Sequence, residues 1–84
     1  MSRALVSTIV DLNRELERAR AKFPGNKNLL PALMEEVGEL ATALMENEGT
    51  DRVRAEALQV ACVALRIFEE GEPAFPQEVP DAVA

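Results

Sequence analysis

The sequence predicts an all-α protein, a helical bundle of three helices per chain that is completed by oligomerisation. Three segments carry apolar residues at alternating steps of three and four, which is the spacing of an amphipathic helix. Proline and glycine punctuate the chain between these segments. Hydrophobic residues make up 48% of the 84 residues and aromatic residues only 4%. A composition rich in Ala, Val and Leu with so few aromatics is typical of helices rather than of a β-sandwich.

Residues 3–22 are predicted to form the first helix. Its apolar stripe consists of Leu5, Ile9, Leu12, Leu16 and Ala19. Most charged residues of this segment lie off the stripe, and we expect them to be solvated. They are Arg14, Glu15, Glu17, Arg18 and Arg20. The sequence Phe23-Pro24-Gly25-Asn26 then breaks the helix, because proline and glycine together favour a turn.

The second helix is predicted to run from about Leu29 to Asn47, with Asn28 as its N-cap and Gly49 as its stop. Pro31 lies in the first turn, where its missing N–H costs little. The expected buried stripe consists of Leu30, Leu33, Val37, Leu40 and Leu44.

Thr50 or Asp51 is expected to cap a third helix that continues to about Glu70. Between Ala57 and Leu65 the only polar residue is Gln59, so this helix is apolar on nearly every side and should be buried all round. Two neighbouring helices of one short chain cannot cover it, which predicts a second copy. The helical domain is therefore assigned to 1–71, and 72–84 to a Pro-rich tail that Phe75 and Val79 could anchor.

The net charge of −6 argues against nucleic acid or an anionic membrane as the partner. No apolar stretch approaches the roughly 20 residues that a membrane span needs, so a cytoplasmic location is expected. The absence of histidine excludes His-based catalysis and His-ligated zinc. The single cysteine, Cys62, lies in an apolar run and is interpreted as a small core residue.

Two pairs of polar residues form the one cluster that indicates a functional site. Glu36 and Glu39 are three residues apart and should point the same way from the second helix. Glu56 and Gln59 repeat the spacing on the third helix, so antiparallel packing would bring three carboxylates and one amide together. Such oxygen ligands on rigid helices suit Mg²⁺ or Mn²⁺. The alternative is that these are ordinary surface glutamates beside an apolar stripe.

The segment Phe23–Leu44 resembles the start of the metal-binding helix pair in the MazG-like and all-α dCTP pyrophosphatases. The matching residues are Phe23, Lys27-Asn28-Leu29 and Glu36-Val37-Gly38-Glu39-Leu40. The family motif is Glu-x-x-Glu, a helical-hairpin spacer and then Glu-x-x-Asp. Glu36 and Glu39 match the first half and Glu56 the second, whereas Gln59 stands in the place of the Asp.

The resemblance implies a Mg²⁺-dependent hydrolase that converts a nucleoside triphosphate to the monophosphate and pyrophosphate. Nucleotide house-cleaning is the role that this reaction suggests. It implies a homodimer or homotetramer. Glu36, Glu39, Glu56 and Gln59 become metal ligands, Glu35 a catalytic helper, and Phe23, Lys27 and Asn28 substrate-binding residues. Phe23 could instead be a core residue, and Asn28 only a helix cap. Residues that could hold the phosphates are Lys22, Lys27, Arg52, Arg54 and Arg66.

Two other functions stay open. One is a non-catalytic helical oligomer that acts as a regulatory module. The other is a protein that binds nucleotide and metal without turnover. Gln59 in the place of the Asp favours the regulatory module, and the three glutamates favour the enzyme.

Overall fold

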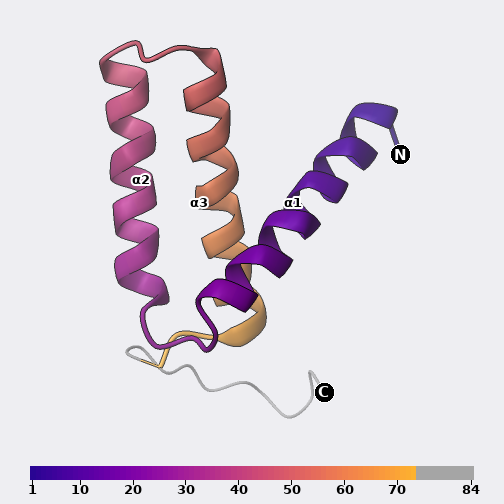
Figure 1. The fold of residues 1–84 in the computed structure, drawn as a ribbon, viewed down its shortest axis with the longest axis vertical. Helices are drawn as coiled ribbons and strands as arrows, with labels where there is room; N and C mark the ends of the chain where they lie inside the picture. Colours follow the sequence, from indigo (N-terminus) through magenta and orange to yellow (C-terminus); the bar gives the residue numbers. More distant parts are fainter. Residues whose placement is uncertain (74–84) are drawn as a thin grey trace.

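The computed structural model describes residues 1–73, which form three α-helices: α1 (Arg3–Lys22), α2 (Leu29–Met45) and α3 (Thr50–Glu70) (Figure 1). No strand occurs in this part of the chain, so the prediction of an all-α protein with three helices is confirmed. The proposed anchors Phe75 and Val79 lie outside the described residues. None of the three helices is both long and apolar enough to cross a bilayer.

The helix bounds agree closely with the spacing pattern, but the caps differ. Ser2 Oγ accepts from the backbone N–H of Leu5 at the start of α1 (3.1 Å). Asn28 precedes α2 yet its side chain makes no capping hydrogen bond, so the expected Asn28 cap is wrong. Glu72, which follows α3, caps α2 instead. Its Oε2 accepts a hydrogen bond from the backbone N–H of Leu30 (2.6 Å). The cap expected from Thr50 or Asp51 is also absent, since α3 begins directly after Gly49 and has no side-chain cap.

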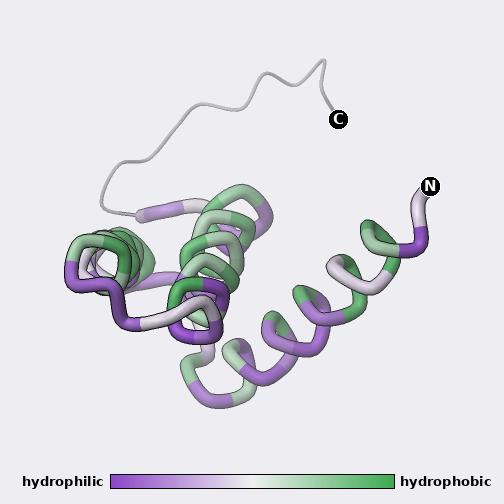
Figure 2. Tube along the Cα trace, turned by 90° about the horizontal axis from the view of Figure 1, so that it is seen from above, coloured by the Kyte–Doolittle hydropathy of each residue, from purple (hydrophilic) through white to green (hydrophobic). Residues whose placement is uncertain are grey.

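The helices α2 and α3 lie side by side as an antiparallel hairpin, and α1 leaves them at an angle (Figure 1). Within the described residues, α1 contacts α3 but not α2. Its stripe is therefore covered only near the C-terminal end, where Leu16 is buried. The apolar residues of the N-terminal half continue along one side of α1 with no cover (Figure 2). They are Leu5, Val6, Ile9 and Val10.

The loop between α1 and α2 is tied to the end of α3 by a buried arginine. Arg66 is only 3% exposed and donates from Nη2 to the carbonyls of Phe23 (3.0 Å) and Gly25 (2.7 Å). Its Nε pairs with Glu70 Oε2 (2.9 Å), and Asn26 Nδ2 donates to the Glu70 carbonyl (2.6 Å). We call these residues, Phe23, Gly25, Asn26, Arg66 and Glu70, the loop clasp. Arg66 is thus committed to the protein itself, which removes it from the candidate phosphate ligands.

The stripe expected to be buried on α2 is buried only in part. Leu30, Leu33 and Leu40 are half-buried, whereas Val37 and Leu44 are exposed. The fully buried residues of α2 are Leu29 and Ala43, because the helix carries two apolar faces and the one that meets α3 runs past Glu36.

The uncovered apolar face of the hairpin lies on the side opposite α1. On α2 and α3 these residues recur at three-four spacing, and on α3 they lie about half a helical turn from the residues that face α1. We call them the outer face: Met34, Val37, Ala41 and Leu44 on α2, and Ala57, Ala61, Ala64 and Phe68 on α3. Met34 is 67% exposed and Phe68 84% exposed. The α3 residues expected to be buried all round are thus open on this side within one chain.

Candidate metal centre

Three glutamates from the hairpin converge at the interface of α2 and α3. Glu36, Glu39 and Glu56 each offer a carboxylate oxygen, and these oxygens all lie within 4.8 Å of one another. Glu56 is only 5% exposed, while Glu36 and Glu39 are half-buried. The convergence of these three carboxylates agrees with the motif. We call them the acidic triad.

Two oxygens of the triad lack a partner. Glu36 Oε2 and Glu56 Oε2 are buried and have no hydrogen-bond partner among the described residues. Arg52 Nη2 pairs with the other oxygen, Glu56 Oε1, at 3.0 Å. One arginine against three carboxylates leaves the cluster negative, and a buried unpaired carboxylate oxygen is costly. A divalent cation would satisfy both oxygens at once.

The electrostatics of Glu36 reflect this crowding. Burial, reinforced by the charge of Glu39 and by the adjacent Glu56, raises the pKa of Glu36 to about 7. Two ionised carboxylates cannot hydrogen-bond to each other, whereas a protonated Glu36 can donate to Glu56. Near neutral pH Glu36 is therefore partly protonated.

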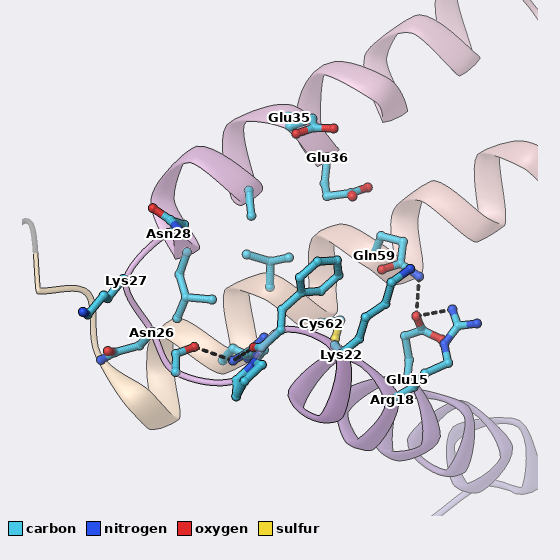
Figure 3. A pocket seen from close by; sticks show the side chains of 18 residues that line it. Glu15, Arg18, Lys22, Asn26, Lys27, Asn28, Glu35, Glu36, Gln59 and Cys62 are labelled. Carbon is cyan, nitrogen blue, oxygen red and sulfur yellow. Dashed lines mark hydrogen bonds and ion pairs between the residues drawn. The ribbon is translucent and has the colours of Figure 1, made fainter.

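A pocket of about 1050 Å³ adjoins the triad. The C-terminal half of α1, the loop 23–28 and the facing sides of α2 and α3 form its walls (Figure 3). Its apolar lining includes Ala19, Leu29, Ala32, Cys62 and Val63. Its basic side chains are Arg18, Lys22, Lys27 and Arg66. Glu36 belongs to both the triad and the pocket wall, so the two features are continuous.

Gln59 has a partner that the sequence did not indicate. Its Nε2 donates to Glu15 Oε1 on α1 (2.7 Å), and Arg18 Nη2 donates to the same oxygen (2.6 Å) (Figure 3). The hydrogen bond from Gln59, together with that from Arg18, lowers the pKa of Glu15. The amide nitrogen of Gln59 is therefore bound by Glu15 and not by a residue of the acidic triad. Its Oε1 faces away from Glu15 and stays available.

The remaining sequence-based site residues gather on the pocket wall. Phe23, Lys27, Asn28 and Glu35 all line it. Phe23 is 63% exposed, so its interpretation as a core residue is wrong. Lys22 Nζ lies 5.3 Å from the centre of the Phe23 ring, within the range of a cation–π contact. Neither Glu39 nor Glu56 lines the pocket. Glu36 is the residue of the acidic triad that does.

Glu15 is the pocket residue that sequence reasoning missed. It was grouped with the solvated charges of α1. The available signal is its position three residues after Leu12 and four before Ala19, directly beside the apolar stripe. A charged residue at that position flanks the buried side of a helix.

A comparison with protein-family models found no match. Searches of curated proteins and of solved structures found no significant match either. The resemblance to MazG-like pyrophosphatases therefore rests on the motif residues of this chain alone.

Proposed function

We propose that this chain is a MazG-like, Mg²⁺-dependent nucleoside triphosphate pyrophosphohydrolase, which converts a triphosphate to the monophosphate and pyrophosphate. One observation carries the proposal. Two buried, unpartnered carboxylate oxygens, on Glu36 and Glu56, lie beside a nucleotide-sized pocket that carries lysines. An acidic cluster of this kind, continuous with a pocket that has basic groups, suits a substrate that brings a cation with its phosphates.

The donor set fits Mg²⁺ or Mn²⁺. All three side chains of the acidic triad supply carboxylate oxygens, the ligands that these hard cations prefer. Mg²⁺ takes one or two protein carboxylates and completes its octahedron with waters and substrate phosphates. Gln59, the fourth ligand that the motif implies, is bound by Glu15 through its amide nitrogen, so the protein ligands come from the triad.

In the proposed reaction, water attacks the α-phosphorus and the bond to the oxygen bridging the α- and β-phosphates breaks. Bound Mg²⁺ would supply positive charge that stabilises the transition state and the pyrophosphate leaving group. Lys22 would offset part of the remaining phosphate charge, and Lys27 would bind at the nucleoside end of the pocket (Figure 3). Glu35, exposed on the pocket wall, would accept the proton of the attacking water. Phe23 and Asn28 would contact the nucleoside.

The test is incubation of the purified chain with Mg²⁺ and each common ribo- and deoxyribonucleoside triphosphate, with products followed by ³¹P NMR. The proposal predicts pyrophosphate without orthophosphate. Glu36→Gln and Glu56→Gln should each abolish it, whereas Glu46→Gln, an exposed residue after α2, should not. No cleavage of any nucleotide with either Mg²⁺ or Mn²⁺ would leave the binding or regulatory module as the better account.

The same proposal includes self-association through the outer face. Larger side chains on α2, such as Met34 and Leu44, stand beside a row of alanines on α3. In a two-fold pair of hairpins, the α2 row of one chain would fill the groove above the alanine row of the other. A homodimer, or a homotetramer built from it, would thus bury the face that one chain leaves open.

A second candidate function has one specific observation in its favour. The amide of Gln59 is fixed by Glu15 instead of replacing the missing Asp carboxylate. A site with one charge fewer holds its cation less tightly. The chain would then bind nucleotide and metal with little turnover, and binding without pyrophosphate release in the same assay would identify this function.

A further inference from the structure

The strongest unassigned feature of the pocket is the side-chain pair formed by Glu15 and Gln59. It links the α1 wall to the α3 wall, since Gln59 Nε2 donates to Glu15 Oε1 at 2.7 Å. Arg18 Nη2 donates to the same oxygen at 2.6 Å. Both Glu15 and Gln59 line the pocket, and neither belongs to the acidic triad.

The hydrogen-bond directions in this pair are fixed by chemistry. A carboxylate can only accept, so Gln59 must present its nitrogen to Glu15 and its oxygen elsewhere. The close-up view shows the Gln59 amide with its nitrogen toward Glu15 and its oxygen turned away (Figure 3). The pair therefore offers acceptor oxygens to the pocket, and it suits a ligand group that donates O–H or N–H.

The position of the pair along the pocket indicates which part of a nucleotide it would meet. Gln59 follows Glu56 by three residues on α3, a rise of about 4.5 Å along the axis. Lys27 and Asn28 lie at the other end, in the loop before α2 (Figure 3). In a nucleotide the sugar follows directly after the α-phosphate, and the base follows the sugar. With the phosphates at the acidic triad, the sugar comes to the level of Gln59.

We propose that Glu15 and Gln59 accept hydrogen bonds from the sugar hydroxyls and so make the site prefer ribonucleotides to deoxyribonucleotides. This inference rests on the proposed nucleotide function of the same site. A carboxylate that binds a ribose hydroxyl is a common solution in nucleotide-binding proteins. Arg18 offsets the charge of Glu15, so the carboxylate is tolerated near the phosphates.

The test compares matched ribo- and deoxyribonucleotide pairs in parent and variants. The probes are non-hydrolysable α,β-methylene triphosphates of adenosine and guanosine and their 2′-deoxy forms, titrated calorimetrically with Mg²⁺. We expect the parent to bind the ribo form at least about tenfold more tightly, the effect of one hydrogen bond to a charged group. Glu15→Gln keeps an oxygen for Gln59 and Arg18 but removes the charge, so the ratio should fall toward one.

The control is Glu17→Gln, an exposed α1 residue outside the pocket, which should keep the parent ratio. Circular dichroism verifies that both variants keep their helical content. If Glu15→Gln loses helix, Gln59→Met, which removes the other acceptor oxygen, serves instead, and the ribo preference should again decline. Equal binding of both sugars by the parent, or an unchanged ratio in a folded variant, overturns the sugar inference and leaves the proposed function standing. No binding of either sugar form overturns both.

Discussion

Glu36 is the central residue of the candidate site. It shares the acidic triad with Glu39 and Glu56 and also lines the pocket. Its raised pKa and its unpartnered Oε2 have one cause, the removal of several carboxylates from water at the same place. If the triad binds a cation, as proposed, the cation must compete with the proton of Glu36.

Stability of the metal-free chain should depend on the titration of Glu36. Its carboxyl has an ordinary pKa of 4.5 when unfolded and about 7 when folded. The folded state thus holds a proton that the unfolded state has lost, and its stability falls as pH rises from 4.5 to 7. In EDTA, the melting temperature of Glu36→Gln should rise relative to that of the parent as the pH is raised from 5 to 8. A constant difference between the two across this range would contradict the assignment.

Cation binding should show the opposite trend with pH. A cation needs Glu36 ionised, so Mg²⁺ affinity should rise from pH 6 to pH 8 and then level off. Calorimetric titration with Mg²⁺ at several pH values measures this affinity. Repeating it in buffers of different ionisation enthalpy gives the number of protons that binding releases. An affinity that is independent of pH in this range would show that Glu36 is not a ligand.

At the scale of elements, the sequence predicted the helices better than their faces. The bounds of α1 and α3 follow from the stripe and the flanking Pro and Gly residues, whereas α2 ends two residues early at Met45. The buried face of α2 was predicted only in part because the helix has two apolar faces, and spacing alone does not say which meets α3. The triad was predictable from the paired motifs. The Glu15–Gln59 pair was not, because it depends on the angle at which α1 crosses α3.

The loop clasp is the element-scale feature that holds the pocket wall in place. Replacing Arg66 by Met keeps most of its volume but removes the donors to the Phe23 and Gly25 carbonyls. We expect a loss of about 2–3 kcal/mol in the free energy of unfolding, the contribution of hydrogen bonds to a charged group. Urea denaturation measures it, with Arg14→Met on the exposed side of α1 as the control, expected within about 0.5 kcal/mol of the parent. Equal effects of the two changes would mean that the clasp contributes nothing specific.

The clasp also predicts a sensitivity to acid. The hydrogen bond from Arg66, opposed by burial and assisted by Arg20, lowers the pKa of Glu70 from 4.5 to about 2. Its contribution to stability is present above pH 4.5 and is lost as pH falls toward 2. Denaturation should therefore show a gap in stability between the parent and Glu70→Gln at pH 6, and this gap should shrink to about half or less at pH 3. A gap of equal size at both pH values would contradict this origin of the stability.

At the scale of the whole molecule, the two sides of the hairpin differ in their surfaces. One side carries the pocket and receives α1, and the other is the apolar outer face. Within residues 1–73 the buried apolar core consists of Leu16, Leu29, Ala43 and Cys62. A core of this size gives little stability on its own, so we expect covering the outer face to stabilise the fold.

Self-association through that face should be abolished by a single charge. Ala61 lies in the middle of the α3 row, and Ala61→Glu would bring two carboxylates into a two-fold interface. Sedimentation equilibrium should show a dimer or tetramer for the parent and a monomer for the variant. The parent should also melt at a temperature that rises with its concentration. Ala21→Glu, exposed on α1, is the control. A folded parent monomer at micromolar concentration would exclude this assembly.

The central claim is that the acidic triad binds a divalent cation, and titration with Mn²⁺ followed by electron paramagnetic resonance tests it most directly. We predict saturable Mn²⁺ binding that Mg²⁺ displaces. The affinity should fall at least about tenfold in Glu56→Gln, since a ligand charge is lost, and stay unchanged in Glu46→Gln. Saturating ion should also raise stability, by about 2.7 kcal/mol at a hundredfold excess over Kd. No saturable binding, or the same affinity in Glu56→Gln as in the parent, would contradict the account.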